Sequence, residues 1–287
     1  LFLKMQNEEI KKNYLKKIKK FYNHNKSYYE ESKPTVTDAE FDILKAEILG
    51  LENEYSFLNS LYSPSKTIGF KPSKNFQKIK HKVPMLSLGN VFDEEGLRNF
   101  EKKINNFLSL KSTNIIQYSA EPKIDGISAS LVYINGKFTK GLSRGDGTEG
   151  EDITQNLKTI KDIPLEIAAK NFPKEIDIRG EVFIENDDFK KISEKFANPR
   201  NAASGSLRQK DPIITSKIPL KFIAYTFGYT EKMNIQSQID FLKNLKIWGF
   251  KINQFNKMIS GIKNLLHNHK YLEEKRKEIP FDIDGVV

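Results

Sequence analysis

Residues 121–143 read EPKIDGISASLVYINGKFTKGLS, and this stretch decides the fold of the larger part of the chain. Two β-like runs, 127–134 and 138–143, flank the pair Asn135-Gly136, which is typical of a tight type I′ turn. The stretch therefore predicts a β-hairpin. Just before it, Pro122 and Gly126 predict a tight turn that presents Lys123.

Further strands and helices are predicted on both sides of the hairpin. Residues 176–184 alternate between an apolar face and a polar face that carries Asp177, Arg179 and Glu181. Additional strands are predicted at 115–120, 221–227 and 281–287, and helices at 92–108, 237–248 and 259–277. We expect an α+β domain over residues 76–287, in which helices flank antiparallel sheets.

The first 75 residues have a helical pattern. Between Glu8 and Tyr22, apolar residues recur every four positions among lysines, which predicts an amphipathic helix with a basic outer face. These residues are Ile10, Tyr14, Ile18 and Tyr22. A second helix is predicted from Thr37, with a buried stripe of Phe41, Leu44, Ile48 and Leu51. Residues 63–82 are rich in proline, glycine and polar residues, so we expect a small helical domain over 1–75 and a linker after it.

Composition favours a soluble protein with polyanionic partners. The 287 residues include 47 lysines and arginines against 37 aspartates and glutamates, a net charge of +10. A biased genome composition explains that charge equally well. The chain has no cysteine and four scattered histidines, which excludes disulfides and thiolate metal sites within it. No apolar run reaches the ~18 residues of a membrane span, and LFLKMQNEEI is not a secretory leader, so we expect a cytoplasmic protein without membrane contact.

Lys123 is the candidate nucleophile. A lysine attacks only as the neutral amine, and an ordinary lysine, with a pKa near ~10.4, needs burial or neighbouring cations to lose its proton. Arg144 is a candidate cation, and the carboxylates of Glu121 and Asp125 are placed to orient a nucleotide and a metal. Attack on phosphorus would give a lysyl phosphoramide. The alternative is a surface turn that carries one of 47 basic residues, because Lys-x-Asp-Gly is a short motif that recurs in part as Ile283-Asp284-Gly285.

Four separate segments carry a more specific pattern. They are 121–133, 143–152 (SRGDGTEGED), 178–183 (IRGEVF) and 282–286 (DIDGV). In their order along the chain and in their residues, they resemble the nucleotidyltransferase motifs of NAD-dependent DNA ligases. The resemblance extends through Ser63-Pro64, 83–88 (VPMLSL) and 196–203 (FANPRNAA), and so covers almost the whole chain. It implies a small helical domain followed by an ATP-grasp-like adenylation domain.

The resemblance also implies roles for individual residues. Lys123 aligns with the nucleophile that attacks the AMP phosphorus of NAD and becomes joined to AMP. Glu121 aligns with the reader of the adenine, and Arg144 and Glu181 align with contacts to the ribose and phosphate. Further implied nucleotide contacts are Ser87, Leu88, Asp125, Gly126 and Tyr225. Tyr225 would stack on the base, although an ordinary core aromatic is an equal interpretation.

The N-terminal module is expected to select the dinucleotide. Asp38 and Asp42 are four residues apart, so both carboxylates project from one side of a helix. Together with Tyr28 and Tyr29 they suit the flat, positive nicotinamide ring. A solvated helix face explains the two aspartates equally well. Residues 38–42, which are Asp38, Ala39, Glu40, Phe41 and Asp42, resemble the nicotinamide-mononucleotide site of the family. Phe41 stands where the family usually has tyrosine. Phenylalanine keeps the aromatic ring for stacking but lacks the hydroxyl group.

Arg200 and Arg208, in a predicted loop from 198 to 209, resemble residues that approach DNA phosphates, but two arginines in a polar loop need no functional explanation. The resemblance implies magnesium, with the carboxylates of Asp125, Glu181 and Asp284 nearby, while its ligands stay undetermined. The family has a lysine just beyond the position of Val287, so we expect a fragment of a longer monomeric enzyme that seals nicked duplex DNA in replication and repair. Such a fragment is expected to bind NAD, to adenylate itself slowly or not at all, and not to seal nicks.

Two other functions remain open at this point. An ATP- or GTP-using nucleotidyltransferase shares Lys-x-Asp-Gly but has no reason to keep the module that includes residues 28–42. A non-catalytic nucleic-acid-binding protein would account for the +10 charge without any role for Lys123.

Overall fold

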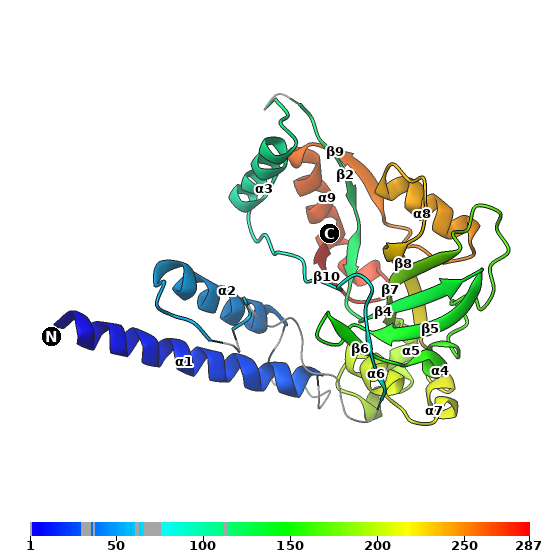
Figure 1. The fold of residues 1–287 in the computed structure, drawn as a ribbon, viewed down its shortest axis with the longest axis horizontal. Coiled ribbons are helices and arrows are strands. Elements are labelled where there is room, and N and C mark those ends of the chain that lie inside the picture. The colour runs from blue at the N-terminus through cyan, green and yellow to red at the C-terminus, as the bar shows by residue number, and fades with distance from the viewer. Residues whose placement is uncertain (1, 30–35, 37, 61–62, 66–75, 112–113) are drawn as a thin grey trace. The chain divides into compact units, whose positions relative to one another are not determined.

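The structure is a computed structural model that describes residues 2–29, 36, 38–60, 63–65, 76–111 and 114–287 (Figure 1). The chain divides into two compact units. One comprises Leu1–Leu86 together with Ser143–Asp152, and the other comprises Ser87–Leu142 together with Ile153–Val287. Residue 75 lies outside the described residues, so the domain boundary predicted there stays a prediction.

The first unit contains two long helices and a small sheet. Its elements are α1 (Phe2–Tyr29), α2 (Asp38–Glu54), β1 (Lys78–Lys80) and β6 (Glu149–Glu151). Helices α1 and α2 pack through a core of Tyr14, Ile18, Phe21, Leu44, Ile48 and Leu58. The Tyr14 hydroxyl donates to Glu52 Oε1 at 2.6 Å, which satisfies the one polar atom that this ring brings into the core. Strands β1 and β6 pair antiparallel, with Ile79 opposite Gly150.

The predicted apolar stripe of the first helix was wrong at its last position. Tyr22 is 38% exposed, whereas its neighbour Phe21 is 4% exposed and belongs to the core. A helix turns once every 3.6 residues, so a strict spacing of four drifts away from the buried face after two or three turns. The core uses the spacing 14, 18, 21 instead. The predicted cap Thr37 lies outside the described residues.

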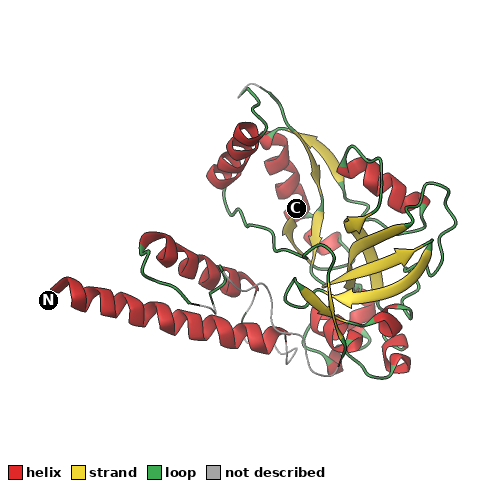
Figure 2. Cartoon of the chain, viewed as in Figure 1, coloured by secondary structure: helices red, strands yellow, loops and turns green. Residues whose placement is uncertain are grey.

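The second unit is a mixture of helices and antiparallel strands (Figure 2). Its strands are β2 (Gln117–Ala120), β3 (Pro122–Ile124), β4 (Ile127–Ile134), β5 (Lys137–Ser143), β7 (Glu175–Phe183), β8 (Lys221–Thr230), β9 (Lys257–Ser260) and β10 (Ile283–Val286). Its helices are α3 (Glu94–Phe107), α4 (Thr154–Leu157), α5 (Asn186–Lys190), α6 (Pro199–Leu207), α7 (Pro212–Ser216), α8 (Gln238–Ile247) and α9 (Ile262–Glu274), with short 3-10 helices at Ser193–Lys195 and Arg276–Glu278. The predicted α+β class is confirmed.

The main sheet has the order β5-β4-β7-β8, with β4–β7 and β7–β8 antiparallel. The predicted hairpin forms β4 and β5, and its turn residues Asn135 and Gly136 have φ angles of 50° and 76°, as a type I′ turn requires. Helix α6 contacts β4 and β7, and α8 contacts β8, so helices flank the sheet (Figure 1).

Two further pairs of strands join segments that are far apart in the sequence. Strand β2 pairs with β9, and β3 pairs with β10, both antiparallel. The turn predicted around Lys123 was therefore wrong, because Lys123 is the central residue of strand β3. The helix predicted from Ile259 begins only at Ile262, after β9. In the described part of the chain no helix is long and apolar enough to cross a membrane.

Candidate active site

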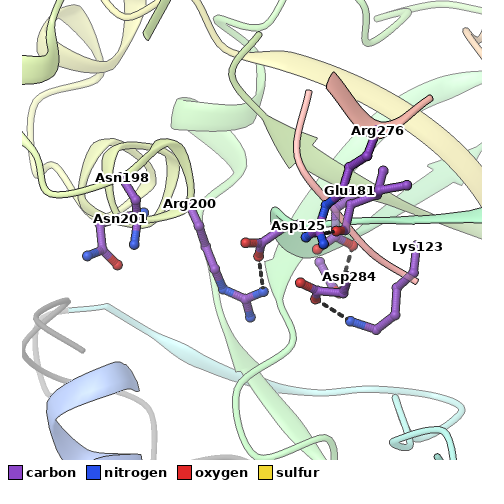
Figure 3. A network of polar contacts seen from close by, with 10 residues as sticks. Lys123, Asp125, Glu181, Asn198, Arg200, Asn201, Arg276 and Asp284 are labelled. Carbon is purple, nitrogen blue, oxygen red and sulfur yellow. Dashed lines mark hydrogen bonds and ion pairs between the residues drawn. The ribbon is translucent and has the colours of Figure 1, made fainter. Parts of the chain in front are cut away.

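The pairing of β3 with β10 places Lys123 beside Asp284. Lys123 lies opposite Gly285 in the ladder, and the register shifts between Ile283 and Gly285, where Asp284 is located. Lys123 Nζ lies 2.6 Å from Asp284 Oδ2 (Figure 3). The Lys123 side chain is 46% exposed, so it is accessible to a ligand, although the ion pair contains the charged ammonium and attack requires the neutral amine.

Asp125, two residues after Lys123, is held by an arginine from α6. Arg200 Nη1 lies 2.6 Å from Asp125 Oδ1 (Figure 3). Arg200 is in the first turn of α6, which begins after Asn198, whose side chain accepts from the Asn201 backbone N–H at 2.7 Å. The loop predicted over 198–209 was thus wrong. These residues form a capped helix, and its first turn holds the backbone of Arg200 in place. Burial raises the pKa of Asp125, and the neighbouring Arg200 opposes that rise.

Glu181 of β7 is the most strongly perturbed carboxyl of the group. It is 9% exposed and accepts a hydrogen bond from Ser128 Oγ at 3.0 Å. Burial raises the pKa of Glu181 from its ordinary 4.5 to about 7, against opposing contributions from Arg200 and Lys123. Asp125 adds to the rise through like-charge repulsion. A carboxyl that changes charge near neutral pH, close to a lysine, is typical of functional sites.

Gly126, between β3 and β4, allows the start of β4 to lie close to β7. A Cβ atom at this position would lie 2.4 Å from the Val182 carbonyl oxygen and 2.8 Å from Glu181 Cγ. Neither distance is compatible with any side chain, so glycine is required here for space. The Gly in Lys-x-Asp-Gly therefore brings Glu181 next to the segment that carries Lys123 and Asp125.

Glu121, on the other side of Lys123, is held by three donors. Ser119 Oγ and Gln238 Nε2 donate to Oε1 at 3.0 and 2.8 Å, and Asn256 Nδ2 donates to Oε2 at 3.3 Å. Gln238 also donates to the backbone carbonyl of Tyr225 at 2.6 Å, which ties β8 to this carboxylate. Burial raises the pKa of Glu121 in spite of these bonds.

The polar face predicted for β7 is buried. Asp177 and Arg179 are 5% and 8% exposed, and they form an ion pair at 3.2 Å. Ser130 of β4 donates to the same aspartate. These three side chains thus form a buried polar cluster in the sheet that carries Glu181.

The structure does not gather all the predicted residues. Ser87 and Leu88 lie in an exposed segment, and Arg208 follows the last residue of α6. Arg144 lies in the turn before β6, where Gly145 and Gly147 have φ angles of 56° and 88°. Arg144 belongs to the unit that contains α1 and α2, and Ser87 and Leu88 follow that unit directly in the sequence. The roles of these three residues and of Arg208 stay predictions.

Most of the predicted nicotinamide residues lie outside what the structure describes at side-chain level. These are Tyr28, Tyr29, Asp38, Ala39 and Asp42. Glu40 is exposed on α2. Phe41 is partly buried and stacks on Phe21 of α1, with ring centroids 4.9 Å apart, so this ring contributes to the α1–α2 core.

Sequence reasoning missed several contributors. It assigned Asp284 only to a possible metal, and it did not identify the polar residues that hold the carboxylates: Ser119, Ser128, Gln238 and Asn256. The repeated tripeptide Ile-Asp-Gly was the available signal, because its two copies are the paired segments, with Ile124 opposite Ile283.

The described side chains near Lys123 include carboxylates that could help to hold a magnesium ion. Within the described residues, no three acidic or histidine side chains are arranged to hold a metal ion. Magnesium usually keeps several waters and binds through one or two carboxylates plus substrate phosphates. Asp125 and Asp284 could supply these one or two carboxylates. In this structure Asp125 is paired with Arg200, and Asp284 is paired with Lys123.

The comparisons with known proteins identify the family of this chain. The family described as NAD-dependent DNA ligase adenylation domain matches residues 73–287. The chain belongs to the NAD-dependent DNA ligase family. A second description, DNA ligase-like, N-terminal NAD+-binding domain, matches residues 7–69. Ligases of this family use NAD as the AMP donor, and magnesium is their usual ion.

Individual relatives of the ligase family extend over nearly the whole chain. A DNA ligase of Pelagibacter ubique (strain HTCC1062) is 74% identical over 99% of this chain and 42% of its own length. A DNA ligase of Rickettsia bellii (strain OSU 85-389) is 44% identical over 99% of this chain and 42% of its own length. A DNA ligase of Parvibaculum lavamentivorans is 44% identical over 92% of this chain and 38% of its own length. The chain thus spans about two fifths of the length of the curated relatives that it matches.

The raised pKa of Glu181 gives a testable pH dependence of stability. A raised carboxyl pKa means that the folded state keeps a proton that the unfolded state loses between pH 4.5 and about 7, so this group makes unfolding easier as the pH rises through that window. Glu181→Gln removes the effect. The unfolding free energy of the variant minus that of the parent is therefore expected to rise by roughly 3 kcal/mol from pH 4 to pH 8.

Urea unfolding at several pH values measures this gain. Glu273→Gln, at an exposed position of α9, is the matched control and should show no such pH-dependent gain. A constant difference between Glu181→Gln and the parent from pH 4 to pH 8 would show that the pKa of Glu181 is the same in the folded and unfolded states.

Proposed function

We propose that this chain carries out the first chemical step of an NAD-dependent DNA ligase, with Lys123 as the nucleophile. The observation that carries the proposal is the placement of an accessible lysine on β3, within reach of Asp284 and beside the buried carboxyl of Glu181. Surface turns do not assemble such a group from segments separated by 161 positions. Membership of the ligase family supports the same assignment.

The proposed step transfers AMP from NAD to Lys123. The ion pair with Asp284 opens and the ammonium releases a proton to solvent, so that the lone pair of Nζ is available; a second proton leaves the nitrogen to solvent as the phosphoramide forms. Nζ then attacks the phosphorus of the adenylyl half, a phosphorus–nitrogen bond forms, and the bond from that phosphorus to the bridging oxygen breaks. Nicotinamide mononucleotide leaves with the bridging oxygen.

The remaining site residues are assigned as proposals. Glu121 recognises the adenine base through its carboxylate, which its hydrogen bonds hold in place. Tyr225 stacks on the same base. Further nucleotide contacts are Ser87, Leu88, Asp125, Gly126, Arg144 and Glu181, and the nicotinamide half is bound by Tyr28, Tyr29, Asp38, Ala39, Glu40, Phe41 and Asp42. Magnesium bound by nucleotide phosphates and the nearby carboxylates would offset the phosphate charge.

We also propose that the complete enzyme passes AMP to a DNA 5′ phosphate at a nick, and that it acts as a cytoplasmic monomer. Arg200 and Arg208 are proposed to approach DNA phosphates. Because Arg200 is paired with Asp125 in this structure, it would have to exchange that carboxylate for a phosphate.

The expected result is selectivity for NAD over ATP. Calorimetric titration of the chain with NAD, nicotinamide mononucleotide and ATP should show binding of the first two, and Asp42→Ala should weaken both. Long incubation with NAD, and not with ATP, should add the mass of one adenylyl group to Lys123. Preferential labelling by ATP would replace this proposal with an ATP-using nucleotidyltransferase.

A further inference from the structure

Helix α1 carries a large share of the charge of the whole chain. Its 28 residues include eight lysines and two glutamates, a net charge of +6, whereas the whole chain has a net charge of +10. Both glutamates, Glu8 and Glu9, lie near the start of the helix, and residues 10–29 contain no acidic residue. The positive charge is therefore concentrated on the part of α1 that follows them.

Three lysines of α1 lie on the face opposite to the core. Lys12, Lys16 and Lys19 are spaced by four and three positions, so they form one row along the helix. All three are exposed, whereas Tyr14, Ile18 and Phe21 on the other side pack against α2. We call Lys12, Lys16 and Lys19, with the exposed Lys11 and Lys20 at its borders, the α1 basic stripe.

Within the described residues, the lysines of this stripe form no ion pair with a carboxylate. Their neighbour Lys17 differs, because its Nζ lies 2.5 Å from Glu47 of α2. Exposed lysines on other helices are also paired, such as Lys190 with Asp187 at 2.7 Å and Lys243 with Asp240 at 3.0 Å. Like charges four residues apart on a helix repel each other, so the stripe lowers helix stability unless an anion neutralises it.

From this arrangement we propose that the α1 basic stripe binds the phosphate backbone of duplex DNA. At 1.5 Å per residue, Lys12 to Lys19 span about 10 Å, and a duplex carries one negative charge per ~1.7 Å of axis, so all three lysines can contact phosphates at once. Contacts of this kind position a protein on DNA without reading sequence. An anionic membrane is the less suitable partner, because the apolar face that would enter the lipid is already buried against α2.

The choice of DNA rests on the proposed ligase function, and the test separates the two. The chain and the variant Lys12→Gln/Lys16→Gln/Lys19→Gln are titrated with a 30-base-pair duplex of arbitrary sequence at several salt concentrations. The matched control is Lys263→Gln/Lys270→Gln/Lys277→Gln, which removes the same charge from exposed lysines of α9 and the turn after it. NAD binding is measured on all three proteins, and circular dichroism establishes that α1 is folded.

The α1 variant should bind the duplex at least about tenfold more weakly at low salt, and the slope of log affinity against log salt should become shallower by about 2 to 3. The control should keep the parent slope within about one unit, and NAD binding should be equal in all three proteins. Equal losses in both variants would overturn the proposal in favour of a general charge effect. So would an unchanged slope in the α1 variant. A parallel titration with phosphatidylserine vesicles, in which the α1 variant lost vesicle binding but kept DNA binding, would overturn it in favour of a membrane. A parent that binds DNA but not NAD would count against the ligase function alone.

Discussion

Replacing Lys123 with arginine is expected to abolish the covalent incorporation of AMP from NAD, by at least about a thousandfold in rate. Arginine keeps the positive charge and can retain the ion pair that Lys123 makes with Asp284 at 2.6 Å. A guanidinium with a pKa above ~12 does not become a neutral nucleophile. Affinity for NAD should change by less than about threefold, since the other nucleotide contacts remain. Intact-mass measurement after long incubation with NAD reports the adduct.

Lys140→Arg, in strand β5, is the matched control for this substitution. It makes the same chemical change in the same sheet-rich unit and should leave AMP incorporation unchanged. If Lys123→Arg still gained one adenylyl mass, peptide mapping would locate the true nucleophile elsewhere, and the proposed role of Lys123 would be wrong.

Gly126→Ala should cause the largest loss of stability among the substitutions considered. The new Cβ would lie 2.4 Å from the backbone carbonyl oxygen of Val182, which has no rotamer by which to move away. Relief requires the start of β4 to move away from β7, at a cost of about 2–3 kcal/mol in the free energy of unfolding. At roughly 2–4 °C per kcal/mol for a unit of this size, the melting temperature should fall by about 4–12 °C.

Gly89→Ala provides the comparison within the same unit, because a Cβ there meets no atom within 4 Å. It should be neutral or slightly stabilising, since alanine restricts the unfolded chain. Thermal unfolding followed by circular dichroism measures both variants. Equal melting temperatures for the two would mean that the start of β4 and β7 accommodate a methyl group between them, and that the close approach at Gly126 is not rigid.

Local pattern was sufficient to predict the longer strands of the main sheet and the turn between two of them. Strand β4 occupies Ile127–Ile134, as predicted, and Asn135-Gly136 forms the predicted turn. Strand β7, predicted at 176–184, is Glu175–Phe183. Long alternating runs and a turn pair that requires positive φ leave few other conformations, so these predictions depended on little beyond the segments themselves.

The elements closest to Lys123 could not be predicted in the same way. Strand β3 has three residues, too few for a period of two to be visible, and its partner β10 is more than 150 residues away. Helix α6 was missed although Asn198-Pro199 is a good N-cap followed by proline in the first turn. The polar composition of 198–209 was given more weight than this cap. Asp284 gained its partner only through tertiary pairing, which composition and spacing do not encode.

The pairing of β3 with β10 also affects when the candidate site can form during protein synthesis. Glu121 and Val287 exchange two backbone hydrogen bonds of 2.8 Å, and Lys123 reaches Asp284 across 161 positions. A ribosome adds about 5–20 residues per second, so roughly ten to thirty seconds pass between synthesis of the lysine and synthesis of its partner strand. Until then the β3 edge has no partner to hydrogen-bond. Nascent chains that stop before residue 283 should therefore lack a formed nucleophile strand, however well their earlier hairpin has folded.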